Sequence, residues 1–320
     1  MTTLRIGTRG SALALWQART VAGLLEARGA RVELVIIKTA GDRLQERPLT
    51  ETGTKRLFVK EIEDALLRGD VDLAVHSAKD LPATLPDGLA VAAVLPREDP
   101  RDALVLPGGT EHQDLATALA HLGEAPVIGT SSVRRIAQLA SAVPRASFAP
   151  IRGNVDTRLR KLDAGEFHAL VLAAAGMRRL GFGSRISTAI PMDVCVPAPG
   201  QGIVALEIRG DDGTTREILE GVNDREAGLS LEAERTVVAA LGGGCQLPLG
   251  AISLHDKGTL TVRAVVASPD GTQVIRSEAS GPASDAAGLG RRVAEQLART
   301  GATAILDAVR ATGDSRLPRD

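Results

Sequence analysis

The sequence is poor in aromatic residues, with no tyrosine, one tryptophan and four phenylalanines among its 320 residues. Its 44% hydrophobic content must therefore form aliphatic cores, rich in Ala, Val and Leu. Cysteine is also scarce, and Cys195 and Cys245 are too few for a disulfide framework. A chain of this length has room for two or three domains.

Neither sign of charge is in excess, since 38 basic and 39 acidic residues leave a net charge of -1. That balance argues against a general nucleic-acid binder. No apolar run reaches membrane-spanning length, and residues 1–6 show no basic region followed by an apolar segment. We therefore expect a cytoplasmic α/β protein with neither a membrane nor a nucleic-acid partner.

Metal and nucleotide motifs are missing as well. The histidines are scattered and neither cysteine has a metal-ligand partner at typical spacing, so we expect no metal. The chain has no G-x-x-x-x-G-K-[ST] loop, and the segment 7–10 is too short for a dinucleotide fingerprint.

Two parts of the chain share a pattern of strand, small-residue turn and helix. A strand at 4–7 leads through a turn at 8–11 into a helix at 12–27, and the pattern returns from 127 onward. A second similar pair follows in the same order, at 67–75 and 163–171. Strand–turn–helix geometry offers backbone N–H groups to an anion. The ordered repeat predicts two α/β lobes facing a cleft; chance recurrence of short fragments is the alternative.

The chain is expected to cross between the lobes twice. The charged, proline-bounded segment 96–102 is typical of a crossover, and the Pro- and Gly-rich segment 193–202 of a return hinge. We therefore assign residues 1–97 with 198–216 to the first lobe and 98–197 to the second. Residues 217–320 then form a small α+β domain, with a helix, a hairpin of two strands at 260–267 and 273–277, and two closing helices. The polar stretch 39–56 is predicted to be a long loop or lid.

A cysteine follows three glycines in the segment 242–248, just after a predicted helix. Glycine lets the backbone adopt positive φ and removes bulk, so this loop suits a presented Cys245 sulfur. A glycine helix cap in front of an inert cysteine is an equal alternative on spacing alone.

Basic residues gather at the predicted turns, where the arginine fork can bind carboxylate or phosphate. They are Arg9, Arg134, Arg135, Arg152 and Arg158. Any one of them taken alone is better explained as a solvated surface residue, whereas the set indicates a ligand with several negative charges. Asp80 follows Lys79 at the end of a strand, where it could stabilise positive charge, pass a proton, or merely cap a helix.

Eight segments, in order along the chain, resemble the hydroxymethylbilane synthase (porphobilinogen deaminase) family. They are RIGTRGS at 5–11, LFVKE at 57–61, VHSAKDLP at 75–82, REDPRD at 97–102, IGTSSVRR at 128–135, IRGNV at 151–155, PAPGQG at 197–202 and GGCQLP at 243–248. The resemblance implies two periplasmic-binding-protein-like α/β lobes around a cleft plus a small C-terminal α+β domain. It also implies a transferase of haem and porphyrin biosynthesis that acts on porphobilinogen, and nothing in the sequence requires more than a monomer.

By the same resemblance, Cys245 holds a dipyrromethane cofactor through a thioether. Four porphobilinogen molecules are added to it with loss of ammonia, and water releases hydroxymethylbilane. Asp80 assists deamination and stabilises the cationic azafulvene. The cofactor would be bound by Cys245, Lys79, Asp80, Ser131, Arg134 and Arg135. The substrate would be bound by Arg9, Ser11, Lys55, Phe58, Arg152 and Arg158.

Two departures and two rival functions complete the interpretation. Arg56 stands where the family usually has a glycine, and Cys195 matches no functional residue and is interpreted as a packed small hydrophobe. A non-catalytic two-lobed binding module for an anionic solute would explain the arginines but neither Cys245 nor Asp80. An enzyme acting on a phosphate ligand would leave the glycine–cysteine loop unexplained.

Overall fold

The fold was analysed in a computed structural model that describes residues 3–40, 59–112, 114–244 and 247–314. The first lobe is built on a five-stranded sheet in the order β2-β1-β3-β10-β4. Strand β1 (Thr3–Thr8) runs parallel to β2 (Arg31–Ile36) and β3 (Leu73–Ser77), whereas β10 (Val204–Arg209) is antiparallel to β3 and β4 (Leu89–Val94). Its helices are α1 (Ala12–Glu26) and α3 (Lys60–Leu67), and a 3-10 turn, η1 (Ala78–Asp80), follows β3.

The second lobe repeats this topology with the order β7-β6-β8-β5-β9. Here β6 (Val127–Gly129) is parallel to β7 (Ser147–Ala149) and β8 (Ala169–Ala173), and β5 (Asp102–Val105) is antiparallel to β8 and β9 (Thr188–Ala189). The helices are α4 (Leu115–Ala120), α5 (Val133–Ala142), α6 (Val155–Asp163) and α7 (Ala174–Arg179). The predicted repeat of two α/β lobes is therefore confirmed.

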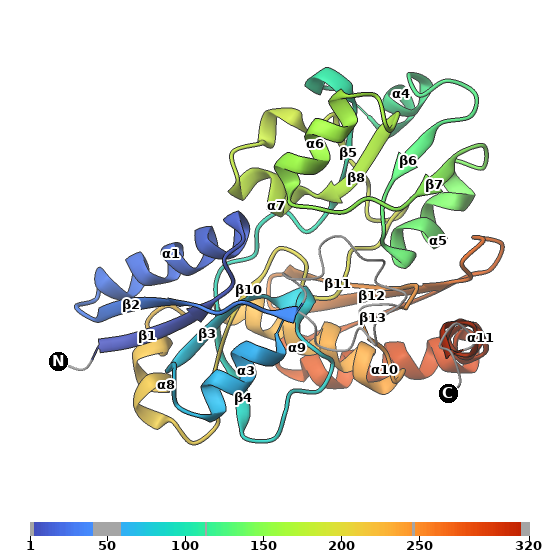
Figure 1. Cartoon of the computed structure of the whole chain (residues 1–320). Coiled ribbons are helices and arrows are strands. Elements are labelled where there is room, and N and C mark those ends of the chain that lie inside the picture. The colour runs from blue at the N-terminus through green and yellow to red at the C-terminus, as the bar shows by residue number, and fades with distance from the viewer. Residues whose placement is uncertain (1–2, 41–58, 113, 245–246, 315–320) are drawn as a thin grey trace, which may run out of the picture.

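The C-terminal part packs helices on a three-stranded antiparallel sheet in the order β11-β12-β13. The strands are β11 (Leu249–Asp256), β12 (Thr259–Ala267) and β13 (Val274–Pro282). The helices are α9 (Arg225–Ala240), α10 (Ala286–Arg299) and α11 (Ala302–Asp314). Helix α8 (Gly213–Glu220) leads in from β10 and packs on the first lobe, where Leu219 joins the hydrophobic core. Figure 1 shows the second lobe standing above the other two parts. The predicted α/β fold class with a C-terminal α+β domain is confirmed, and the domain limits stay a prediction.

The two-strand hairpin predicted for this domain was incomplete, because β11 was missed. Its first five residues are buried, and they read as a short apolar run rather than as the alternation of a half-exposed strand. Strand β11 also contacts the return segment between the lobes, because the Ala251 N–H donates to the Pro197 carbonyl at 3.0 Å.

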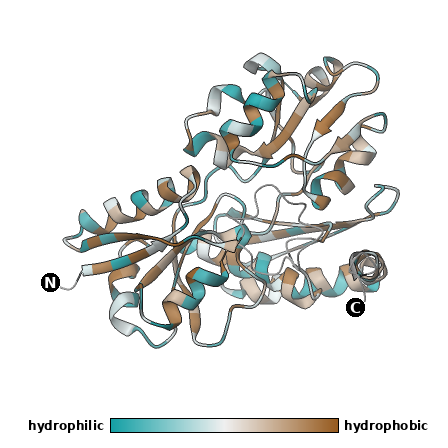
Figure 2. Cartoon of the chain, in the orientation of Figure 1, coloured by the Kyte–Doolittle hydropathy of each residue, from teal (hydrophilic) through white to brown (hydrophobic). Residues whose placement is uncertain are grey.

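Aliphatic side chains fill the cores, as the lack of aromatics requires. The cores of the first lobe and of the C-terminal domain contain only Ala, Val, Leu and Ile. Figure 2 shows the hydrophobic residues concentrated on the strands and on the helix faces turned toward them.

A buried ion pair joins the crossover to the C-terminal domain. The Arg97 guanidinium donates to both oxygens of Glu234 on α9, at 2.6 and 3.1 Å. The Glu234 carboxylate also accepts the backbone N–H groups of Gly200 and Ser253. This fully paired carboxylate fixes the return segment beside the first lobe.

Candidate functional site

A cavity of about 340 Å³ lies between the two α/β lobes. Its walls come from segments that follow the carboxyl ends of β1, β3, β6, β7 and β8, the position where open α/β sheets bind ligands. Of the residues predicted for the site, eight line it: Arg9, Ser11, Lys79, Asp80, Ser131, Arg135, Arg152 and Arg158. Residues far apart in the sequence are thus brought together.

Helix N-termini point into the same space. Ser11 is the N-cap of α1 and accepts the N–H of Ala14, and Ser132 caps α5 by accepting the N–H of Arg135. Helix α6 starts after Asn154, beside the lining residues 151–155. The Ser131 hydroxyl donates to the Ile151 carbonyl at 2.8 Å and accepts its N–H at 3.0 Å, which joins two of these turns. The positive ends of the helix dipoles therefore add to the field that favours an anion.

The cationic side chains of the cavity are crowded. Burial lowers the pKa of Lys79 to about 8, with Asp80 opposing that shift and Arg135 adding to it. Burial also lowers the pKa of Arg158 to about 10, and repulsion from Arg135 and Arg152 contributes. Both shifts mean that the charged forms are disfavoured in this cavity, so an anionic ligand would stabilise them.

Asp80 is the single carboxylate among the described residues that line the cavity. It ends the η1 turn, and its side chain is exposed. Its charge raises the pKa of the neighbouring Lys79, which places the two groups in electrostatic contact. An exposed carboxylate among cations is suited to stabilise positive charge that develops on a ligand.

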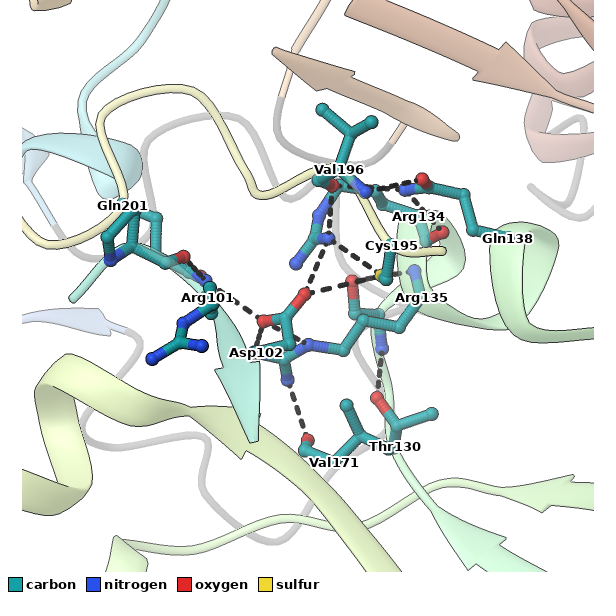
Figure 3. Close-up of polar contacts among 12 residues, drawn as sticks. Arg101, Asp102, Thr130, Arg134, Arg135, Gln138, Val171, Cys195, Val196 and Gln201 are labelled. Carbon is teal, nitrogen blue, oxygen red and sulfur yellow. Dashed lines mark hydrogen bonds and ion pairs between the residues drawn. The ribbon is translucent and has the colours of Figure 1, made fainter. Parts of the chain in front are cut away.

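Behind the cavity wall lies a fully buried aspartate, Asp102, at the start of β5 (Figure 3). Its Oδ1 accepts from Arg135 at 2.8 and 3.0 Å, and its Oδ2 accepts from Arg134 at 2.7 Å. Burial alone would raise the pKa of Asp102, but the two guanidiniums hold it well below its usual range. The charges of neighbouring arginines on α5 are thus balanced inside the protein.

Arg134 and Arg135 differ in their relation to the cavity. Arg135 lines it while its guanidinium also donates to the Val171 carbonyl. Arg134 does not occur among the described lining residues, and it is 5% exposed. Its guanidinium donates to Asp102, to the Cys195 sulfur and to the Val196 carbonyl. The family resemblance predicts that Arg134 binds the cofactor. Its buried position and its three contacts inside the protein do not support that prediction, which stays untested.

Four further polar residues line the cavity that sequence reasoning did not assign to the site: Ser77, Asn154, Arg179 and Gln201. Gln201 lies in the PAPGQG segment, which was a signal that could have identified it. Arg179 on α7 donates to the Gly202 carbonyl at 2.6 Å and lies over the Trp16 ring of α1, 5.6 Å from its centroid. Arg179 is the second of two arginines that follow an apolar run, and its sequence context carries no comparable signal.

Cys195 is fully buried, as the interpretation of a packed residue expected. Burial and the neighbouring Asp102 raise the pKa of its thiol to about 12, so it is a poor nucleophile. Cys245, Lys55 and Phe58 lie outside the described residues. The glycines before Cys245 do end α9: Gly242 has φ of 61°, and the N–H of Gly243 donates to the Val238 carbonyl.

Within the described part of the chain, no three His, Cys, Asp or Glu side chains gather as a metal site would need. No helix in that part is long and apolar enough to cross a membrane.

Fold and cavity together define a two-lobed α/β protein with a cationic cleft between its lobes. The chain belongs to the porphobilinogen deaminase family. Residues 4–217 match the family model described as "Porphobilinogen deaminase, dipyromethane cofactor binding domain", and residues 229–299 match "Porphobilinogen deaminase, C-terminal domain".

Whole-length relatives support this membership. The chain is 44% identical over 308 residues to a porphobilinogen deaminase of Syntrophobacter fumaroxidans, covering 96% of this chain and 97% of that one. It is 46% identical over 309 residues to one of Chromobacterium violaceum, covering 95% and 97%.

Solved structures with more distant similarity include two substrate-binding proteins. One is the second substrate-binding domain of an amino acid ABC transporter from Streptococcus pneumoniae, with a TM-score of 0.44, 12% identity and coverage of 69% of this chain and 92% of that one. The other is the methionine-binding protein MetQ, with a TM-score of 0.43, 12% identity and coverage of 71% and 92%.

Proposed function

We propose that the protein is a hydroxymethylbilane synthase, which joins four porphobilinogen molecules on a covalently bound dipyrromethane and releases hydroxymethylbilane after hydrolysis. The observation that carries the proposal is the composition of the cavity wall in a chain of this family. Six cationic side chains and one carboxylate line it: Arg9, Lys79, Arg135, Arg152, Arg158, Arg179 and Asp80. A pyrrole substrate with two carboxylates per ring and a cation-forming reaction suits that balance.

The residues present fit a dipyrromethane cofactor. Its carboxylates would bind Lys79, Arg135 and the N-terminus of α5. The lowered pKa of Lys79 means that its ammonium is destabilised at the cavity wall, and a carboxylate beside it would stabilise the charged form. The Asp80 carboxylate would accept hydrogen bonds from the pyrrole N–H groups. When bound, dipyrromethane supplies the free pyrrole carbon at which substrate is added. Arg9, Ser11, Arg152 and Arg158 would hold the carboxylates of incoming substrate.

The chemistry required of the protein is charge stabilisation and proton movement. In each addition the methylene–nitrogen bond of porphobilinogen breaks, ammonia leaves, a carbon–carbon bond forms and one ring proton is released. The Asp80 carboxylate stabilises the positive charge that develops as ammonia departs. It is also placed to take the proton that is released. The arginines hold the carboxylates in register, so the reacting carbons meet in the correct geometry.

The working form is proposed to be a cytoplasmic monomer whose partner is porphobilinogen, with no nucleic-acid or membrane partner. The net charge of -1 supports the absence of a nucleic-acid partner, because nucleic-acid binders usually carry a basic excess.

The test of the function is the cofactor itself. Wild-type protein purified from cells that make porphobilinogen should carry an adduct of the mass of one dipyrromethane and colour with Ehrlich's reagent. The Cys245→Ser protein should carry none. Cys195→Ser is the matched control, and it should keep the adduct because the Cys195 thiol is buried and its pKa is raised to about 12. An unmodified, colourless and inactive wild-type protein would refute the proposal.

Arg158 is expected to be needed for chain elongation. Replacing it with leucine removes a cavity cation that is already destabilised by burial, so folding should be retained. Loss of a charged hydrogen bond to a substrate carboxylate should slow elongation about 10- to 100-fold. Intact mass spectrometry after a short exposure to porphobilinogen should then detect protein that carries fewer substrate units than wild type.

Arg160→Leu on the same helix serves as the control for Arg158. Arg160 is exposed and lies opposite Asp156 at 3.9 Å, away from the described cavity lining. Its variant should elongate at the wild-type rate. Equal slowing of both variants, or unfolding of Arg158→Leu alone, would indicate a structural role for Arg158.

A further inference from the structure

Gln201 occupies an unusual place at the junction of the lobes. It lies on the segment that returns from the second lobe to the first, it is 1% exposed, and it still lines the cavity. Its neighbours Gly200 and Gly202 have φ of 72° and 89°, and a Cβ on Gly202 would collide with the Glu98 carbonyl. The backbone around Gln201 is therefore fixed, and its side chain is directed by that fixed backbone.

Every polar atom of the Gln201 amide is engaged. The Nε2 group donates to the Pro100 carbonyl at 2.7 Å and to Asp102 Oδ1 at 2.9 Å (Figure 3). The Oε1 atom accepts from Lys79 Nζ at 3.3 Å. An ionised carboxylate can only accept and an ammonium can only donate, so these neighbours determine which end of the amide faces which group.

The amide therefore connects a buried anion of the second lobe to a cavity cation of the first. The charged groups that act on Lys79 are Asp80 on its own turn, Asp102 on β5, and Arg134 and Arg135 on α5. Two of these four are cations that would push the ammonium away. Gln201 supplies a neutral acceptor on the side of Lys79 that faces Asp102.

We propose that Gln201 is a positioning residue that holds the Lys79 ammonium at the cavity wall, with Asp102 and the Pro100 carbonyl orienting its amide. This inference rests on the proposed function, in which Lys79 binds a carboxylate of the cofactor. It extends that function by naming the group that sets the position and protonation of Lys79.

The experiment measures the pKa of Lys79 directly, by NMR titration of full-length protein labelled at the lysine Cε carbons. Lys79 is assigned by the signal missing from Lys79→Met. A Cys245→Ser background keeps the protein free of cofactor, so the result does not depend on turnover. Gln201→Met removes the acceptor and should lower the pKa of Lys79 by about one pH unit, because a hydrogen bond to the charged form is lost. Gln201→Asn keeps the amide but is one methylene shorter, so it should lose the 3.3 Å contact with Lys79 Nζ and lower the pKa of Lys79 as well.

Gln138→Met is the matched control. Gln138 is also 1% exposed and bonds to Val196 beside the Asp102 centre, but it is not among the described lining residues. It should cost similar stability and leave the pKa of Lys79 unchanged. An unshifted pKa in Gln201→Met, or an equal shift in Gln138→Met, would overturn the proposal. If Gln201→Met does not fold, Gln201→Asn decides, and a wild-type Lys79 pKa in that variant contradicts the inference.

The same variants in the cofactor-loaded enzyme separate positioning from general damage. Gln201→Met should raise KM and lower kcat about tenfold, with the alkaline limb of the pH profile moved down in parallel with the Lys79 titration. If the protein never carries the cofactor, the proposed function is wrong. The titration of Lys79 in cofactor-free protein still tests whether Gln201 positions the Lys79 ammonium.

Discussion

Replacing Asp80 with asparagine is expected to lower turnover about 10²- to 10⁴-fold while the protein folds normally. Asparagine keeps the size of the side chain but removes the negative charge from a cavity otherwise lined by cations. Because the charge is needed as ammonia departs, kcat should fall far more than KM rises. The side chain is exposed at the end of η1, so thermal unfolding should differ little from wild type.

The control for Asp80 is Asp87→Asn, a few residues further along the same part of the chain. Asp87 is exposed and does not occur among the described lining residues. Its variant should keep wild-type turnover in a steady-state assay of cofactor-loaded protein. Turnover of Asp80→Asn within a few-fold of wild type would remove Asp80 from the reaction. The titration of Lys79 offers a second check, since loss of the Asp80 charge should lower the pKa of Lys79.

Local patterns predicted the lobes well because each lobe is built from local units. A buried strand followed by a small-residue turn and a capped helix can be recognised within about twenty residues, and each lobe contains one. Eight of the predicted site residues then line one cavity, in segments that follow the ends of such strands. Strand β11 was missed because its buried run has no alternation to reveal it.

The interior of the site could not be predicted in the same way. Arg134 and Arg135 are adjacent in sequence, yet only the second reaches the described cavity lining. Both bind Asp102, and which of them also reaches the cavity depends on how α5 packs against β5 and the return segment. Asp102 itself belongs to a charged, proline-bounded segment that the sequence predicts to be a crossover between the lobes. It is buried because two guanidiniums and the Gln201 amide converge on it from 32, 33 and 99 residues away.

Because of that convergence, a substitution of Asp102 should cost much stability. Asp102→Asn leaves two buried guanidiniums without a counter-charge and turns an amide N–H₂ toward their donors. Breaking a buried ionic group in this way typically costs about 3–5 kcal/mol of unfolding free energy, a large share of the stability of a protein. Urea unfolding at neutral pH should measure the loss.

The control and the pH dependence identify the cause of that loss. Asp64→Asn breaks an exposed pair with Lys60 on α3 and should cost only about 0.3–0.5 kcal/mol. The folded-state pKa of Asp102 is well below its unfolded value, so its contribution is present above about pH 4 and is lost as the pH falls below that. The stability of Asp102→Asn should therefore fall less steeply than that of wild type between about pH 5 and pH 2. Parallel acid slopes for the two proteins would mean that Asp102 does not hold its charge against the arginines, and the cavity wall would then depend on other contacts.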